Sequence, residues 1–307
     1  GYISWGNGLS GSHGKAVTSL TLYNAYHDWC IAQMAKALGR DEVHDRFIAR
    51  AGNYRHVIWP EEQSAWVRMR DGNWMPDFKP RERRFEQNGF CETSAAVTTF
   101  YVPHDPMGLA EMLGGPQAAA EKLNKQFEAA VPERFHLRGR IHGNAWVDYA
   151  NQDGTGMAHY FNRIEHPWLS QKWVREVQHK TFGGVDPYNG YNGDEDQGQM
   201  GAISALMAIG LFQFDGGSGL DPCYDITAPV FDKVTIQLRP EYYNGKTVTI
   251  VCRNQSPKNV YIQSAKWNDK PLTTCCAPHK DLVQGGVLEL ELGPQPNKEW
   301  GLAEYDQ

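Results

Sequence analysis

Apolar residues recur every three or four positions along the first two-thirds of the chain, which is the period of amphipathic helices. This spacing predicts helices over these ranges: 17–38, 41–55, 109–114, 116–130, 157–164, 167–182 and 198–212. Gly39 follows the first range directly, as glycine often does at a helix C-terminus. The segment 57–90, rich in Pro, Gly, Arg and aromatic residues, predicts a long loop.

After Pro229 the pattern changes to alternating apolar and polar positions with many β-branched residues, which is typical of strands. The predicted strands are 234–238, 247–253, 259–267 and 286–293. Turn-forming residues separate them, NGK at 244–246 and NDK at 268–270. We therefore predict a mostly α fold with a β tail: a helical domain over 1–228, with its helices paired in a toroid, and a small antiparallel β-domain over 229–307.

The composition of the 307-residue chain is that of a globular protein, with 41% hydrophobic and 21% charged residues. A net charge of −6, with no dense Lys/Arg block, argues against a nucleic-acid or membrane-surface partner. No apolar run approaches the roughly 20 residues that a membrane-spanning helix needs. The six cysteines show no CxxC spacing, and the sequence alone assigns no disulfide.

Three consecutive acids, Asp194, Glu195 and Asp196, lie between two glycines, directly before the helix predicted at 198–212. The start of a helix favours carboxylates, because unpaired backbone N–H groups and the helix dipole stabilise negative charge there. Carboxylates held ionised in this way suit a catalytic cleft. An ordinary acidic first turn is the alternative, and it is favoured when the segment is considered alone.

Glu92 is a candidate general acid. It lies between Cys91 and Thr93 and close to Phe90, and partly apolar surroundings favour the protonated form of a carboxyl group. Considered alone, an exposed glutamate in the first turn of a helix is the better interpretation. Ten residues later begins VPHD, where His104 is a candidate for substrate binding.

Two further loops carry candidate binding residues. In the Gly-rich segment 147–156, Asn151, Gln152 and Asp153 offer oxygen atoms for recognising hydroxyl groups or for binding a hard cation such as Ca²⁺. In WMPDF, Trp74 is a candidate floor for a sugar subsite, and a packed loop is the alternative.

Nine segments, in order along nearly the whole chain, resemble glycoside hydrolase family 92, the calcium-dependent exo-acting α-mannosidases that invert the anomeric centre. They are DWCIAQMAKALG (28–39), DGNWMPDF (71–78), Glu92 with VPHD (102–105), ANQ (150–152), MAHYFN (157–162), PWLSQKWVREV (167–177), GDEDQGQM (193–200), PVFDKVTI (229–236) and GPQPNKEWG (293–301). The resemblance implies an (α/α)₆ toroid followed by a β-sandwich-like tail. It also implies that an N-terminal β-sandwich and the first helices of the toroid precede Gly1, so that another segment or a second chain packs against residues 1–60.

The resemblance also implies roles for individual residues. Glu92 matches the general acid, Asp196 the base that activates water, and Asp194 the acid that assists the base. Asn151 and Gln152 match a loop that lines the leaving-group subsite beside the metal. We therefore expect a glycan substrate, a Ca²⁺ cofactor with Gln152 and Asp153 as its candidate ligands, and a secreted, periplasmic or cell-surface location.

The sequence departs from the family pattern close to these residues. A Gly-Asn pair and a Trp-Gln-Tyr cluster are replaced by Thr93-Ser94 and by residues 96–98, and a Pro-Ser-x-His segment is replaced by residues 153–156. In the first helix, Tyr23-Asn24 replaces a Glu-Tyr pair and His27 replaces an Asp. Two alternatives therefore stay open: a hydrolase with a changed sugar or linkage, and a carbohydrate-binding relative without activity.

Overall fold

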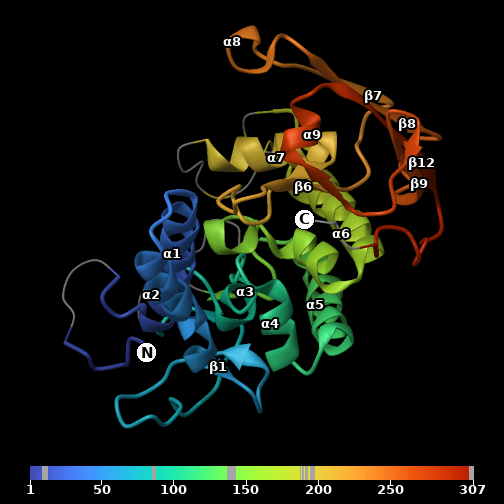
Figure 1. Ribbon diagram of the computed structural model, residues 1–307. Helices are drawn as coiled ribbons and strands as arrows, with labels where there is room; N and C mark the ends of the chain where they lie inside the picture. Colours follow the sequence, from blue (N-terminus) through green and yellow to red (C-terminus); the bar gives the residue numbers. More distant parts are fainter. Residues whose placement is uncertain are drawn as a thin grey trace. The chain divides into compact units, whose positions relative to one another are not determined.

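The computed structural model describes residues 1–8, 13–84, 88–136, 143–186, 188, 190, 193 and 198–303 (Figure 1). The chain forms two compact units, one of Gly1–Met157 with Tyr191–Asp194 and the other of Ala158–Gly190 with Glu195–Gln307. The domain boundary predicted from the sequence lies at 228/229 instead, and it stays a prediction. No helix among the described residues is both long and apolar enough to cross a membrane.

The first unit is built mainly from helices. Its helices are α1 (Val17–Ala37), α2 (Asp41–Ala51), α3 (Ala95–Thr98), α4 (Pro106–Met112) and α5 (Pro116–Ala130). Short 3₁₀ helices are η1 (Gly52–Val57), η2 (Val131–Glu133) and η3 (Gln152–Gly154). Its strands form two antiparallel pairs, β1 (Ile58–Trp59) with β2 (Ser64–Ala65) and β3 (Glu82–Arg83) with β4 (Gly143–Asn144).

The start of α1 anchors the loop that carries Glu92. No side chain caps this helix, and the N–H groups of Thr18 and Ser19 donate instead to Gly89 O at 3.0 and 3.4 Å. Gly89 has a φ of +89°, and a Cβ atom there would lie 2.1 Å from Val67 Cγ2, so only glycine allows this approach. α1 then packs against α2, as the two blue helices of Figure 1 show.

The second unit begins with η4 (Met157–Ile164), α6 (Pro167–Thr181) and α7 (Gln199–Ile209), and it also contains the short helices α8 (Pro240–Tyr243) and α9 (His279–Leu282). Its strands are β5 (Leu211–Phe212), β6 (Cys223–Ile226), β7 (Lys233–Gln237), β8 (Thr247–Arg253), β9 (Tyr261–Trp267), β10 (Lys270–Pro271), β11 (Cys276–Pro278) and β12 (Gly286–Gly293). The structure thus confirms a helix-rich first part and a strand-rich end.

The larger sheet of this unit has the order β10-β9-β12-β8-β7. Strands β8 and β12 are parallel, with Gly286 opposite Val248 and Glu291 opposite Arg253. The sequence predicted an antiparallel domain, and for this pair the prediction is wrong. Parallel neighbours need a long crossover connection, and here the chain makes β9, β10, β11 and α9 before β12 returns between β8 and β9.

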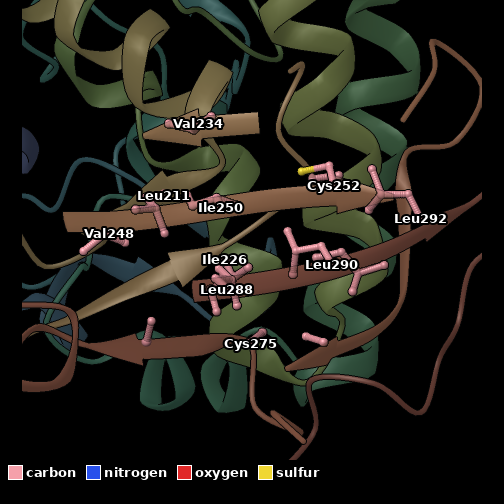
Figure 2. Packing of buried hydrophobic residues seen from close by; sticks show 14 of the residues in the cluster. Leu211, Ile226, Val234, Val248, Ile250, Cys252, Cys275, Leu288, Leu290 and Leu292 are labelled. Carbon is pink, nitrogen blue, oxygen red and sulfur yellow. The ribbon is translucent and has the colours of Figure 1, made fainter. Parts of the chain in front are cut away.

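A second sheet, of order β11-β6-β5, shares one hydrophobic cluster with the larger sheet. Figure 2 shows Ile226 of β6 beside Leu288 of β12, with Ile250 of β8 nearby. Each fully buried Leu or Ile stabilises the fold by about 1.5–3 kcal/mol. The toroid and the β-sandwich-like tail stay predictions.

A disulfide joins Cys223 in β6 to Cys276 in β11. No disulfide could be assigned from the sequence alone, and the two cysteines are 53 residues apart in the chain. They come together because β6 and β11 pair antiparallel, with Cys276 opposite Asp225.

Candidate active site

Glu92 lies half-buried between the loop anchored on α1 and the start of α3. Its φ is +54°, in the left-handed region that residues other than glycine rarely adopt. The neighbouring backbone is held on both sides. Cys91 N donates to Ser19 Oγ at 3.0 Å, and Ser94 caps α3 while its hydroxyl donates to Ala145 O at 3.0 Å.

Asn151 binds Glu92 twice. Its Nδ2 donates to Glu92 Oε2 at 3.1 Å and to Glu92 O at 3.2 Å. Its Oδ1 accepts from Gln152 N at 2.7 Å and so caps η3. Asn151 itself is 8% exposed. The predicted substrate-loop residue and the predicted general acid therefore meet directly.

A buried ion pair supports the Asn151 loop. Arg83 Nη1 lies 3.0 Å from Asp148 Oδ2, and the exposed fractions of the two side chains are 11% and 3%. Asp148 Oδ1 accepts from Ala150 N at 3.0 Å, which fixes the backbone just before Asn151. Removing one partner of such a buried pair destabilises a fold by about 3–5 kcal/mol, because the other charge stays buried.

Asp153 is buried in η3, two residues after Asn151. Tyr23 OH donates to its Oδ1 at 2.5 Å and Thr98 Oγ1 donates to its Oδ2 at 2.7 Å. Burial raises the pKa of Asp153 to about 6, and the two hydrogen bonds oppose that rise. Burial and the neighbouring Asp153 charge also raise the pKa of Tyr23 well above its usual range.

These contacts do not fit the prediction that Asp153 binds calcium. Calcium binds about six to eight oxygen atoms of carboxylates, carbonyls and waters, so a ligand carboxylate must have an oxygen available to the ion. Both oxygens of Asp153 already accept from hydroxyl groups, and the residue is 7% exposed. The described residues contain no group of three or more His, Cys, Asp or Glu side chains able to hold a metal ion. Gln152 stays a candidate, and so does calcium binding as a whole.

The predicted acids Asp194 and Asp196 lie outside the described residues. Gly193, which directly precedes Asp194, is described and has a φ of +79°. A Cβ atom at position 193 would lie 2.1 Å from Ala150 O. The chain therefore passes directly over the backbone of the Asn151 loop, and it can do so because residue 193 is glycine.

Trp74 belongs to a row of aromatic residues. It stacks on Trp59 with ring centroids 5.4 Å apart. Phe78 packs edge-on against both Trp59 and Trp66. The ring centroids of Trp66 and Phe90 are 5.9 Å apart, and Phe90 precedes Glu92 by two residues. Aromatic packing thus accounts for the position of Trp74 in this loop, and a sugar-binding role for Trp74 stays a prediction.

His104 has a packing role in the structure. Its Nε2 lies 3.0 Å from Ala51 O, at the end of α2, and its ring meets Tyr54 edge-on at 5.6 Å. Burial lowers the pKa of His104, so the ring is neutral near pH 7. Its predicted contact with substrate also stays a prediction.

Sequence reasoning missed the partners of Asp153. Tyr23 lies 130 residues from Asp153 and Thr98 lies 55 residues from it, and no local pattern links them. The available signal was their shared departure from the family pattern. The three changed segments, around residues 23, 98 and 153, meet at one carboxyl group.

The chain matches the glycosyl hydrolase family 92 catalytic domain over residues 1–294, and it therefore belongs to that family. A curated relative, an uncharacterized secreted glycosidase of Arthroderma benhamiae, is 27% identical over 314 residues. That match covers 94% of this chain and 37% of the relative.

Two solved structures are similar to the chain. One is a family 92 α-mannosidase of Bacteroides thetaiotaomicron in complex with mannoimidazole, with a TM-score of 0.82 and 26% identity. The other is an inverting mannosidase of the same family from Bacteroides thetaiotaomicron VPI-5482, with a TM-score of 0.80 and 29% identity. The chain is covered to 94% in both, and it spans 37% and 39% of their lengths. A partner segment against residues 1–60 stays a prediction.

Proposed function

We propose that the protein is an exo-acting glycoside hydrolase, an α-mannosidase that releases sugar from the non-reducing ends of glycans by single-displacement inversion. Its membership of family 92 supports hydrolysis of glycosides, and the mannosidases among its structural relatives support mannose as the sugar. The secreted relative supports an extracellular site of action.

The proposed reaction needs two proton transfers, one to the leaving oxygen and one from the attacking water. Glu92 gives its proton to the glycosidic oxygen as the bond from the anomeric carbon to that oxygen breaks. A water attacks the opposite face of the anomeric carbon and gives its proton to Asp196, assisted by Asp194. Inverting enzymes hold the two carboxyl groups roughly 6.5–9.5 Å apart, which leaves room for this water.

The observation that carries the proposal is the contact between Asn151 and Glu92. An amide NH₂ group donates and does not accept, so Glu92 Oε2 is the accepting oxygen of this hydrogen bond. The acid proton is then left on Oε1, where it can be transferred to the leaving oxygen. The approach of Gly193 to Ala150 supports the further proposal that Asp194, the next residue in the chain, serves the same site.

A calcium requirement, which the family resemblance implies, is a separate part of the proposal. Bound calcium would supply positive charge for orienting the sugar hydroxyls. Gln152 and Asp153 are its candidate ligands, and the two hydroxyl groups bound to Asp153 favour Gln152.

A hydrolase with a changed sugar or linkage is the second candidate function. The hydrogen-bonded group of Tyr23, Thr98 and Asp153, built from residues that depart from the family pattern, favours it. A binding protein without activity has less support, because Glu92 is present and Asn151 holds it through two hydrogen bonds, which we call the Asn151 clamp.

The test is release of free sugar from α-linked manno-disaccharides by the natural, full protein, with and without a calcium chelator. We expect mannose release that the chelator abolishes. Release that resists the chelator would keep the hydrolase and remove the metal. If these disaccharides release no sugar but a glycoside from a panel of aryl glycosides does, the result would favour a hydrolase with a changed sugar or linkage. Sugar binding without any product would favour the binding protein.

A further inference from the structure

We propose that Asp153 is a positioning residue for Glu92: bound by Tyr23 and Thr98, it locks the two segments that hold the general acid in its left-handed backbone conformation. This inference rests on the proposed role of Glu92 as the acid. It gives Asp153 a function in place of the metal binding that the sequence predicted.

The first connection runs through η3. Asp153 lies within this single helical turn, and Asn151 is its N-cap. Because the turn is short, fixing Asp153 also fixes the direction of the Asn151 side chain. Asn151 in turn holds the carboxyl group and the backbone carbonyl of Glu92.

The second connection runs through α3. Thr98, the last residue of α3, is 0% exposed, and its Oγ1 lies 2.7 Å from Asp153 Oδ2 and 3.2 Å from Thr93 Oγ1. Thr93 directly follows Glu92 in the chain. Asp153 therefore reaches Glu92 from both sides, through Asn151 and through Thr93.

The number of hydroxyl protons on Tyr23, Thr93 and Thr98 determines which of these groups donates and which accepts. A hydroxyl carries one proton, so Thr98 cannot donate to Asp153 and to Thr93 at once. With Asp153 ionised, Tyr23 and Thr98 both donate to it, and Thr93 donates to Thr98. Every proton in the group then has one acceptor, and the hydroxyl of Thr93 is turned toward Thr98.

The backbone of Glu92 explains why such a lock is needed. A φ of +54° is unfavourable for a glutamate, and the chain adopts it only where neighbouring contacts oppose relaxation. Tyr23 lies on α1, which also binds Gly89 and Cys91 just before Glu92. The three elements α1, α3 and η3 therefore share one anchor at Asp153.

The experiment compares three substitutions in the natural, full protein. Thr98→Val keeps the shape of the side chain and removes the hydroxyl, Tyr23→Phe removes the phenol, and Thr98→Ser restores the hydroxyl. We expect the first two to lower kcat on an α-linked disaccharide by about 10–100-fold, with little change in KM, because a misplaced acid slows the chemical step and not binding. We expect Thr98→Ser to keep kcat within about threefold of the unchanged protein.

Tyr54→Phe is the matched control. Tyr54 is also a buried tyrosine that donates to a carboxylate, Asp105 Oδ2 at 2.7 Å, and Asp105 caps α4 rather than the Glu92 loop. Its loss lowers stability in a similar way, and we expect kcat to be unchanged. Equal losses of kcat in Tyr54→Phe and Tyr23→Phe would overturn the proposal, and so would an unchanged kcat in Thr98→Val.

A crystal structure of Thr98→Val separates this inference from the proposed function. We expect the φ of Glu92 to leave the left-handed region and the contact between Asn151 and Glu92 to lengthen beyond hydrogen-bond distance. If the unchanged protein hydrolyses no glycoside, the proposed function fails, and this structural result still decides the positioning role. An unchanged conformation of Glu92 in the variant would overturn it.

Discussion

Asn151 holds Glu92 by its carboxyl group and its backbone at once, with one amide nitrogen 3.1 Å from Oε2 and 3.2 Å from the carbonyl oxygen. Such a double contact restrains both the side-chain direction and the peptide plane of the residue. It is the kind of arrangement that orients a proton donor before substrate arrives.

Asn151→Asp is the sharpest test of this contact. The aspartate keeps an oxygen to accept from Gln152 N and therefore keeps the cap of η3. It replaces the donor toward Glu92 with an acceptor, so the acid proton of Glu92 is held between the two carboxyl groups instead of being left on Oε1. We expect kcat on α-mannosides to fall by about 10–100-fold with little loss of stability.

The control is Asn124→Asp. Asn124 Nδ2 donates to Glu128 Oε1 at 2.8 Å on the exposed side of α5, so the same chemical change occurs opposite a glutamate on the surface. We expect its kcat to match that of the unchanged protein. Equal kcat values for Asn151→Asp and the unchanged protein would contradict the clamp.

Gly193→Ala tests the approach of the acidic segment to the Asn151 loop. Its Cβ would lie 2.1 Å from Ala150 O, so the backbone next to Asn151 must move. We expect a loss of kcat of more than about tenfold, because small displacements of catalytic groups are costly. Gly39→Ala is the control: its φ is +65°, nothing lies within 4 Å of the new Cβ, and we expect only about 1 kcal/mol lower stability. Equal kcat in both variants would count against the approach.

His159 makes the second unit sensitive to acid. It is 0% exposed and stacks on Phe212 with ring centroids 4.0 Å apart. Burial, with a smaller contribution from Arg163, lowers the pKa of His159 from 6.5 to about 3. Its stabilising contribution is therefore complete above pH 6.5 and is lost as the pH falls towards 3, because the unfolded chain binds the proton first.

The measurement is the free energy of unfolding in urea at pH 7.5 and pH 5.5, for the unchanged protein and for His159→Phe. Phenylalanine keeps the stacking on Phe212 and does not titrate. We expect the unchanged protein to lose about 1.4 kcal/mol more than the variant between these two pH values. The same loss in both proteins would show that His159 is not the titrating group.

The disulfide between Cys223 and Cys276 predicts which thiols react. After denaturation without reductant, alkylation should label Cys30, Cys91, Cys252 and Cys275, which are not part of a disulfide. Peptide mapping should find Cys223 linked to Cys276 and not to the adjacent Cys275. Reduction should lower the free energy of unfolding by about 2–4 kcal/mol. Six labelled cysteines would refute the bridge.

Elements with a strong local pattern could be predicted almost to the residue. Helix α5 starts at Pro116 and ends at Ala130 as expected, and β8 and β12 occupy the predicted ranges 247–253 and 286–293. In α5 proline stands at the first helical position, and in β8 the buried residues alternate, so local chemistry sets these bounds. The pattern did not determine the helix type: residues 52–57, which overlap the helix predicted at 41–55, and residues 157–164 are 3₁₀ helices.

Long-range relationships could not be predicted in this way. The parallel pairing of β8 with β12 and the sheet of β5, β6 and β11 depend on how distant segments pack, and strands of two to four residues carry no clear alternation. The same holds for the site. Glu92 and Asn151 were predicted separately, but their contact, and the binding of Asp153 by Tyr23 and Thr98, arise only from the fold.

The central claim is that Glu92 gives a proton to the leaving oxygen, and Glu92→Gln tests it through the leaving group. We would measure kcat/KM of the variant and the unchanged protein on an α-manno-disaccharide and on a dinitrophenyl α-mannoside. The sugar leaving group needs protonation and the dinitrophenolate does not. We predict a loss of at least about 10³-fold on the disaccharide and less than about tenfold on the aryl mannoside. Equal losses on both substrates, or no loss on either, would contradict the assignment.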